Sequence, residues 1–323
     1  MPMQTISIED ILIDDSRFST NGSLYEPYTS KTSPIDSFRQ LGILYPIVVY
    51  ENGERRLHLI DGRKRIQFVR ETLKGKIDAI VLPHTTPVTD IITLILNNKR
   101  NTVEQSIMNK VQFINFAMHL NVPETWMLDS LCVSFGFKPY SGFLKDCERI
   151  SLLPETLKMF CHEKKYSLKQ IVNLTHYPEE ILLQVMAWGR DIQLTASVLE
   201  EIASNLKDYL RAQKITLKDF LDELALQGII CSSLSPRDKA ERLREFIRLK
   251  RFPILSEVNA RMEKTVESMH LPKEISLSWD RTLENRNVDV TIHMKDISEY
   301  DGLLKTLDSS EMKQAVERIL DEL

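Results

Sequence analysis

The feature that most constrains the fold of this chain is an abrupt change in apolar periodicity near Pro87. Before it, short runs rich in β-branched residues alternate with turn signals. From there to about residue 228, apolar residues recur at intervals of three and four. The first pattern is typical of strands and the second of amphipathic helices. The order of the two patterns predicts an α+β protein, in which a mixed sheet-and-helix domain precedes a helical one.

A β-hairpin is predicted in the front segment. Tyr45–Tyr50 is rich in β-branched residues, and Arg56–Ile60 follows it after a short polar stretch. Asn52 and Gly53 stand between the two runs, and an Asn-Gly pair supplies the two positive-φ residues of a type I′ turn. We therefore expect two antiparallel strands joined by a two-residue connection.

Two helices and a further strand are expected next to this hairpin in the sequence. Ser33 and Pro34 mark the start of the first helix, because serine caps a helix and proline suits its first position. Helical spacing of apolar residues resumes at Arg65, and Gly75 closes that second helix. Ile77–Leu82 then predicts another strand.

The chain is expected to form three regions. Residues 1–86 form an α/β domain, residues 87–228 an all-helical domain, and residues 229–323 a basic helix followed by a small α/β unit. That unit is predicted from a second hairpin, Ile275–Trp279 with Val288–Ile292, and from a final amphipathic helix.

Composition narrows the class of protein. No apolar run approaches the roughly 18 residues that span a bilayer, and the first residues lack the pattern of a signal peptide. We therefore expect a cytoplasmic protein without a membrane partner. The four cysteines show no CxxC spacing, which favours buried thiols over a metal or redox site. The formal net charge is −4, so any DNA-binding surface has to come from local clusters of lysine and arginine.

Three blocks carry a resemblance to a known family. They are Leu41–Val49, which contains Gly-Ile-Leu-Tyr-Pro-Ile, then Leu59–Arg65, and then Asn97–Arg100. In this order they resemble the amino-terminal domain of the ParB family, where a Gly-Ile-x-x-Pro-Ile strand precedes a Gly-Glu-Arg-Arg turn and an Asn-x-x-Arg segment. The resemblance covers about residues 5–180. It implies a ParB/sulfiredoxin-like α/β fold with a nucleotide pocket, which binds CTP in the chromosome-partition members.

The second block predicts an anion site on physical grounds as well. A glycine after a strand lets the backbone turn sharply, and the following helix start offers free N–H groups and the positive end of its dipole. The anion is either a nucleoside triphosphate or a DNA phosphate, and a solvated basic helix start is the alternative. The candidate nucleotide- or phosphate-binding residues are Gly62, Arg63, Lys64, Arg65, Asn97 and Arg100.

The chain departs from the family pattern at two positions. Arg63 stands where the family has glutamate after the glycine, and also where sulfiredoxin has its reactive cysteine. The family's glutamate before the Asn-x-x-Arg segment is replaced by Leu96, or by Asn97 if the alignment shifts by one. Mg²⁺ binds through one or two carboxylates plus substrate phosphates, so we expect poor Mg²⁺ binding and no CTP hydrolysis. No catalytic residue and no metal ligand is assigned.

A helix-turn-helix is predicted at about residues 126–152. A first helix runs to a turn at Gly136, and a second helix follows from Pro139. Cys132 is small enough for the two helices to cross closely. An ordinary helix pair is the alternative, and the place of the motif after a ParB-like domain favours DNA binding. Phe143, Leu144, Cys147 and Ile150 are expected to pack inward. The candidate DNA-binding residues are Lys138, Tyr140, Ser141, Lys145 and Arg149.

Two features of the last region bear on partners. Seven lysines and arginines lie between Arg237 and Arg251, interleaved with acidic residues, so a DNA-contacting helix and a salt-bridged face packed on a core are equally favoured. The resemblance implies a homodimer, because family members often dimerise through their carboxyl ends. We also expect the hairpin with Trp279 to bury that side chain only against a neighbouring chain.

The sequence thus predicts a ParB-like protein that binds double-stranded DNA as a homodimer and responds to a nucleotide, with CTP as the implied cofactor. Its place would be the nucleoid, in chromosome or plasmid partition or in transcription-type regulation. The rival class is a phosphotransferase or nuclease that uses the same pocket, with Asp61 or Glu104 as its carboxylate. A third possibility is a regulator in which the pocket has degenerated and only DNA binding remains.

Overall fold

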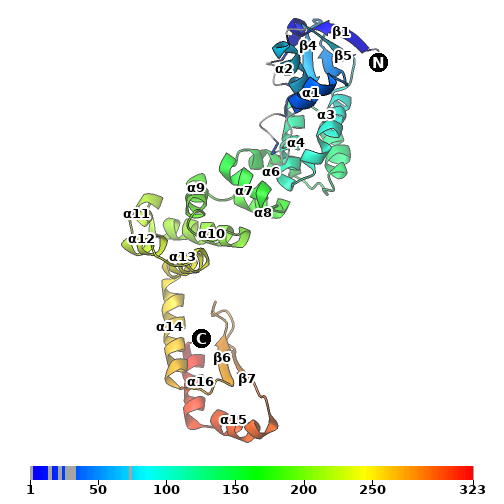
Figure 1. Cartoon of the computed structure of the whole chain (residues 1–323). Helices are drawn as coiled ribbons and strands as arrows, with labels where there is room; N and C mark the ends of the chain where they lie inside the picture. The colour runs from blue at the N-terminus through cyan, green and yellow to red at the C-terminus, as the bar shows by residue number, and fades with distance from the viewer. Residues whose placement is uncertain (1–2, 14–16, 21–23, 26–33, 73–74, 323) are drawn as a thin grey trace. The chain divides into compact units, whose positions relative to one another are not determined.

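The computed structural model describes residues 3–13, 17–20, 24–25, 34–72 and 75–322 (Figure 1). Two compact units are present, Met1–Ala187 and Trp188–Leu323. The mixed α+β class is confirmed, because a sheet forms near the amino terminus and helices make up most of the rest. The finer division into residues 1–86, 87–228 and 229–323 stays a prediction. The expected helix cap Ser33 lies outside the described residues.

The first unit opens with a mixed sheet. Among the described residues its strand order is β1-β5-β3-β4-β2. The β1–β5 and β3–β4 pairs are antiparallel, whereas β3–β5 and β2–β4 are parallel. The strands are β1 (Met3–Ser7), β2 (Ile11–Leu12), β3 (Ile47–Glu51), β4 (Leu57–Asp61) and β5 (Lys76–Leu82), with a 3₁₀ turn at Ile8–Asp10.

The predicted front hairpin is confirmed, but its turn type is wrong. Asn52 N–H donates to Arg56 O, and Arg55 N–H donates to Asn52 O, both at 3.0 Å. The positive φ belongs to Arg55 at 58°, which gives a three-residue connection ending in a left-handed residue. The Asn52 side chain explains the difference, because its Oδ1 accepts the N–H groups of Glu54 and Arg56 and stabilises this wider turn.

Apolar side chains of the sheet form one core with a helix that follows β4. Ile47, Val49 and Ala79 are fully buried, and Ile66 and Val69 pack against them from α2 (Arg63–Glu71). Because Ile66 and Val69 are three residues apart, they lie on one face of the helix, and burying that face attaches α2 to the sheet. The helices of this part are α1 (Pro34–Leu41), α2 (Arg63–Glu71) and α3 (Val88–Val103).

The rest of the first unit is helical. Ser106 caps α4 (Ile107–His119) by accepting the Asn109 N–H, and a Ser167–Gln170 capping box starts α8 (Leu168–Leu174). The helices are α4 (Ile107–His119), α5 (Glu124–Trp126) continued by the π-helix η2 (Met127–Cys132), α6 (Phe143–Ser151), α7 (Glu155–Glu163), α8 (Leu168–Leu174) and α9 (Glu179–Trp188).

The second helix of the predicted helix-turn-helix starts later than expected. Gly142 has φ 93° and caps α6, so Pro139 lies in the preceding loop and not in the helix. A left-handed residue interrupts helical geometry, which is why the helix begins only at Phe143. The inward-packing prediction is confirmed, since Phe143, Leu144, Cys147 and Ile150 are all buried.

The second unit contains a helical part and a part with a two-stranded sheet. Ser235 caps the predicted basic helix by accepting the Asp238 N–H. The helices are α10 (Ala196–Gln213), α11 (Leu217–Leu221), α12 (Leu224–Ile230), α13 (Pro236–Arg251), α14 (Pro253–Ser268), α15 (Tyr300–Leu307) and α16 (Ser310–Glu322), with a 3₁₀ turn at Ile297–Glu299. The strands are β6 (Ile275–Trp279) and β7 (Val288–Ile292).

The second predicted hairpin is confirmed in both strands and in its antiparallel pairing, with Trp279 opposite Val288. The expectation that Trp279 needs a neighbouring chain is wrong. Its side chain is buried among Met262 and Ile319 of the same unit, and its indole N–H donates to Asn259 Oδ1 at 2.8 Å. The helices α14 and α16 cover the tryptophan, so it gives no reason for a dimer.

Two further observations concern composition. Cys132, Cys147 and Cys161 are buried as expected, whereas Cys231 is exposed. None of the described helices is both long and apolar enough to cross a membrane.

Candidate functional site

The candidate site begins where β4 turns into α2. Gly62 has φ 114° and is the residue before the first helical position. A Cβ atom at this position would lie 2.4 Å from Ile47 Cγ2, so only glycine fits here. The first intrahelical bond runs from Ile66 N–H to Gly62 O at 3.0 Å. The N–H groups of the three preceding helical residues therefore have no partner within the helix.

A pocket of about 620 Å³ lies at this corner. This volume is within the range of small-molecule sites, which are commonly about 300–1,000 Å³. The walls combine aromatic and aliphatic side chains with cations and amides. The lining residues are Phe18, Ser19, Thr20, Leu24, Phe38, Leu59, Ile60, Asp61, Gly62, Arg63, Lys64, Arg65, Gln67, Ile95, Asn98 and Lys99.

The three cations of the predicted motif line the pocket, yet they have different surroundings. Arg63 Nη2 donates to Ile13 O at 2.9 Å. Arg65 is more firmly held: Nη2 forms an ion pair with Asp61 Oδ2 at 2.5 Å, and Nη1 donates to the carbonyls of Tyr45 and Pro46. Arg65 therefore ties the start of β3 to the end of β4.

Lys64 has the fewest side-chain contacts of the three cations. Its side chain is exposed, and its ammonium group makes no hydrogen bond or ion pair with any other described residue. An ammonium group at the first turn of a helix adds its charge to the positive end of the helix dipole. Lys64 is therefore the side chain best placed to meet an incoming phosphate.

The third predicted block contributes to the pocket through different residues. Ile95, Asn98 and Lys99 of α3 line it, whereas Asn97 and Arg100 do not. Arg100 instead pairs with Glu104 at 3.0 Å. The signal that sequence reasoning missed is helical phase, because residues 95, 98 and 99 share one face of a helix, and 97 and 100 share another.

The carboxylates proposed for an enzyme role are both engaged in ion pairs. Asp61 pairs with Arg65, and Glu104 pairs with Arg100. Leu96 is buried in α3, and its side chain has no atom that could bind a metal ion. Within the described part of the chain, no group of three or more His, Cys, Asp or Glu side chains is arranged to hold a metal ion. No observation here favours the phosphotransferase or nuclease alternative.

A buried side-chain amide on α4 holds the pocket wall, and sequence patterns did not predict it. Leu24 lines the pocket, and its neighbour Tyr25 is held by Asn109, which is fully buried. Asn109 Oδ1 accepts the Tyr25 N–H at 2.9 Å, and Nδ2 donates to the carbonyls of Tyr25 at 2.9 Å and Thr102 at 2.7 Å. The Tyr25 hydroxyl also donates to Glu155 Oε1 at 2.5 Å.

The predicted DNA-binding residues lie in the loop before α6 and along that helix. Lys138, Ser141 and Lys145 are exposed, and the ammonium groups of the two lysines have no hydrogen-bond or ion-pair partner among the described residues. Tyr140 is 47% exposed, and its hydroxyl donates to Asp146 Oδ2 at 2.5 Å. Burial and this hydrogen bond raise the pKa of Tyr140 to about 12.

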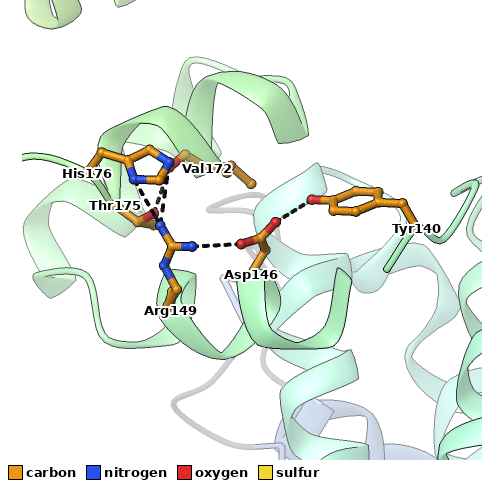
Figure 2. Close-up of polar contacts among 6 residues, drawn as sticks. All are labelled: Tyr140, Asp146, Arg149, Val172, Thr175 and His176. Carbon is orange, nitrogen blue, oxygen red and sulfur yellow. Dashed lines mark hydrogen bonds and ion pairs between the residues drawn. The ribbon is translucent and has the colours of Figure 1, made fainter. Parts of the chain in front are cut away.

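Arg149 differs from the two lysines, as Figure 2 shows. Its Nη1 donates to Asp146 Oδ1 at 3.0 Å, and its Nη2 donates to Thr175 Oγ1 at 2.9 Å and approaches His176 Nδ1 at 3.1 Å. These contacts fasten α6 to the end of α8. The structure thus brings Tyr140, Asp146 and Arg149 together and leaves Lys138 and Lys145 extended into solvent.

The basic helix α13 is largely tied to its own unit. Arg244 pairs with Glu201 at 2.5 Å, Lys250 pairs with Glu223 at 2.7 Å, and Arg251 pairs with Asp208. Leu243 and Ile247 of the same helix are fully buried. These contacts favour the interpretation of a salt-bridged face packed on a core.

Comparisons with known proteins give limited results. No family model and no curated protein matches the chain. One similar solved structure is the C-terminally truncated chromosome-partitioning protein ParB from Caulobacter crescentus complexed to the centromeric parS site. It is 12% identical, with 62% of this chain and 98% of that chain covered at a TM-score of 0.28. The same protein complexed with CTP-gamma-S is 10% identical, with coverages of 58% and 99% at a TM-score of 0.24. At such TM-scores neither likeness establishes a shared fold, so the chain's own residues carry the functional inference.

Proposed function

We propose that this chain is a nucleotide-responsive, ParB-like DNA-binding protein that acts in chromosome or plasmid partition or in transcription-type regulation. The observation that carries the proposal is the pocket of about 620 Å³ at Gly62. It joins a helix start and the cation Lys64 to apolar walls that include Phe18 and Phe38. Cations suit phosphates, and an aromatic wall suits a nucleobase.

CTP is the nucleotide that the sequence resemblance implies, and the pocket fits a nucleotide in general. Gly62, Arg63 and Lys64 would hold the phosphates, with Asn98 and Lys99 facing them from α3. Arg65 would act indirectly, because its guanidinium is occupied by Asp61 and two backbone carbonyls. Bound nucleotide would stabilise the turn at Gly62. The absence of the family's glutamate at Leu96 argues against hydrolysis of the nucleotide.

Calorimetric titration with the four nucleoside triphosphates, with and without a DNA duplex, tests this proposal. We expect binding of CTP in preference to the other three, with phosphate release at background. Lys64→Gln should weaken binding about tenfold, since a charge-assisted contact to phosphate is lost. Lys76→Gln is the matched control, because it removes an exposed lysine from β5 of the same sheet.

Two other results would change the assignment. DNA-stimulated phosphate release from CTP would show a working hydrolytic switch despite Leu96. If no nucleotide binds, the degenerate-pocket alternative is favoured, and the DNA-binding half of the proposal has to be tested alone.

Duplex binding is expected to be electrostatic in large part. Each phosphate contact contributes about −0.9 to the slope of log K against log salt concentration. The double variant Lys138→Gln/Lys145→Gln should therefore reduce the magnitude of that slope by roughly two and weaken binding at low salt. The control is Lys273→Gln/Lys305→Gln, which removes the same charge from exposed positions in the second unit. Equal effects of the two pairs would contradict an interface at α6.

The proposal includes a homodimer, which now rests on an apolar groove of the second unit and not on Trp279. The second unit has an apolar groove lined by Val290, Leu307, Met312, Val316 and Leu320, together with the charged residues Lys313, Glu317 and Asp321. Val290 and Leu320 are each more than 40% exposed, as is typical of a surface that another chain covers. A second copy of this unit would bury this groove.

A further inference from the structure

A chain of polar contacts runs from the loop before α6 to the end of α8 (Figure 2). The Tyr140 hydroxyl donates to one oxygen of Asp146, and Arg149 donates to the other. Arg149 is held in turn by Thr175, whose hydroxyl donates to Val172 O at 2.7 Å. The backbone of α8 therefore orients Thr175, Thr175 orients Arg149, and Arg149 and Tyr140 both contact Asp146.

Burial within this chain is uneven. The side chain of Asp146 is 16% exposed, whereas that of Arg149 is 42% exposed. A largely buried carboxylate is costly unless both of its oxygens are satisfied, and here Tyr140 and Arg149 satisfy them. Turning Arg149 toward a DNA phosphate would leave Asp146 with an unmet negative charge beside the polyanion.

Tyr140 is held in one orientation. Its ring meets the buried Phe143 edge-to-face, with centroids 5.6 Å apart, while nearly half of its surface stays exposed. Because its proton points at Asp146, the phenol oxygen has only lone pairs to offer another partner. The phenol keeps this proton at neutral pH, because the ordinary pKa of tyrosine is about 10 and burial raises the pKa of Tyr140 further, to about 12.

A fixed acceptor distinguishes between base edges. In the major groove the exocyclic amino groups of adenine and cytosine are donors, whereas the O6 of guanine and the O4 of thymine are acceptors. An oxygen that cannot turn its proton toward the base accepts a hydrogen bond from the amino group of adenine or cytosine. The same oxygen is repelled by the O6 of guanine and by the O4 of thymine.

We propose that Tyr140 contacts an exocyclic amino group of adenine or cytosine, and that Asp146 and Arg149 are positioning residues which hold it as an acceptor. This inference rests on the DNA-binding function proposed above. Among the predicted DNA-binding residues, it makes Lys138 and Lys145 phosphate contacts, and it makes Tyr140 a base contact that Arg149 supports without touching DNA.

The test uses the full chain and duplexes selected by it from a random-sequence pool. Affinity is then measured by fluorescence anisotropy for a selected duplex and for a scrambled duplex of the same composition, over a range of salt concentrations. Tyr140→Phe keeps the ring and removes only the hydroxyl. It should reduce the preference for the selected duplex about tenfold and leave the salt slope unchanged. Tyr300→Phe, at a tyrosine of similar exposure in α15, is the control.

The positioning role is tested with Asp146→Asn/Arg149→Gln, which leaves the net charge unchanged. This double variant should lose the same preference as Tyr140→Phe, again without a change in salt slope. Lys145→Gln should do the opposite, lowering affinity for both duplexes and reducing the slope by about one. Thermal unfolding checks that the double variant is folded. If it is not, Tyr140→Phe decides the matter alone.

Several outcomes would overturn the inference. A reduced salt slope in the folded double variant would make Arg149 a phosphate contact. If Tyr140→Phe keeps the preference for the selected duplex, Tyr140 makes no specific base contact. The same conclusion follows if the selection yields no preferred sequence. In both cases the proposal that the chain binds DNA would stand. If the intact chain retains no duplex, the proposed function fails, and this inference fails with it.

Discussion

Gly62→Ala is expected to destabilise the sheet of the first unit by about 3–5 kcal/mol and to abolish nucleotide binding. Gly62 has φ 114°, where an L-residue is strained, and the added Cβ would lie 2.4 Å from Ile47 Cγ2 and 2.9 Å from Ile47 Cβ. A rotamer change of Ile47 cannot relieve the second contact, because the backbone fixes the position of Cβ. Either β3 or the start of α2 has to move, and both form the pocket corner.

Hydrogen exchange at the amides of β3 and β4 measures this effect locally, and nucleotide titration measures its consequence. Gly53→Ala is the matched control, because a Cβ there meets no atom within 4 Å and its φ is not positive. Its effect should stay below about 1 kcal/mol. Retained exchange protection and nucleotide binding in Gly62→Ala would contradict the assigned geometry.

Asn109→Ala is expected to cost about 3 kcal/mol or more and to weaken nucleotide binding markedly. The substitution removes the side-chain partners of the Tyr25 N–H and the Tyr25 carbonyl, and one of the donors to the Thr102 carbonyl, at a side chain that is itself fully buried. Each buried polar group left unsatisfied costs about 1–3 kcal/mol. Leu24, next to Tyr25, would lose its fixed place in the pocket wall.

Tyr25→Phe separates the backbone clamp from the side-chain contact at the same residue. It removes only the hydroxyl that donates to Glu155, so about 1 kcal/mol of stability should be lost and nucleotide affinity should stay close to that of the original chain. Denaturant unfolding and calorimetric titration compare the two variants. Equal losses in both would mean that Asn109 has no special role.

Much of the local structure follows from sequence patterns alone. The change from strand-like to helical periodicity near Pro87 matches the order of sheet and helices, and both predicted hairpins are present. The inward face of α6 was predictable as well, because residues 143, 147 and 150 recur at helical spacing and short-range geometry decides which side chains share a face.

Errors arose where the local conformation of a turn differs from the one that the sequence pattern predicts. The amide of Asn52 accepts two backbone N–H groups and replaces the expected two-residue turn with a wider one. Gly142 takes a positive φ and delays the start of α6, so Tyr140 lies in a loop. Both outcomes depend on local choices with small energy differences, which periodicity does not resolve.

The candidate site shows the same division. The sequence by itself determined that a glycine corner rich in cations follows β4, and that a hydrophobic residue stands at position 96. Only the tertiary structure decided that Arg65 is occupied by Asp61, that Asn98 and Lys99 face the pocket, and that Asn109 holds its wall. The reason is physical: composition and spacing set the charge and phase of each element, but the partner of a long polar side chain depends on which distant backbone groups the fold brings within hydrogen-bond reach.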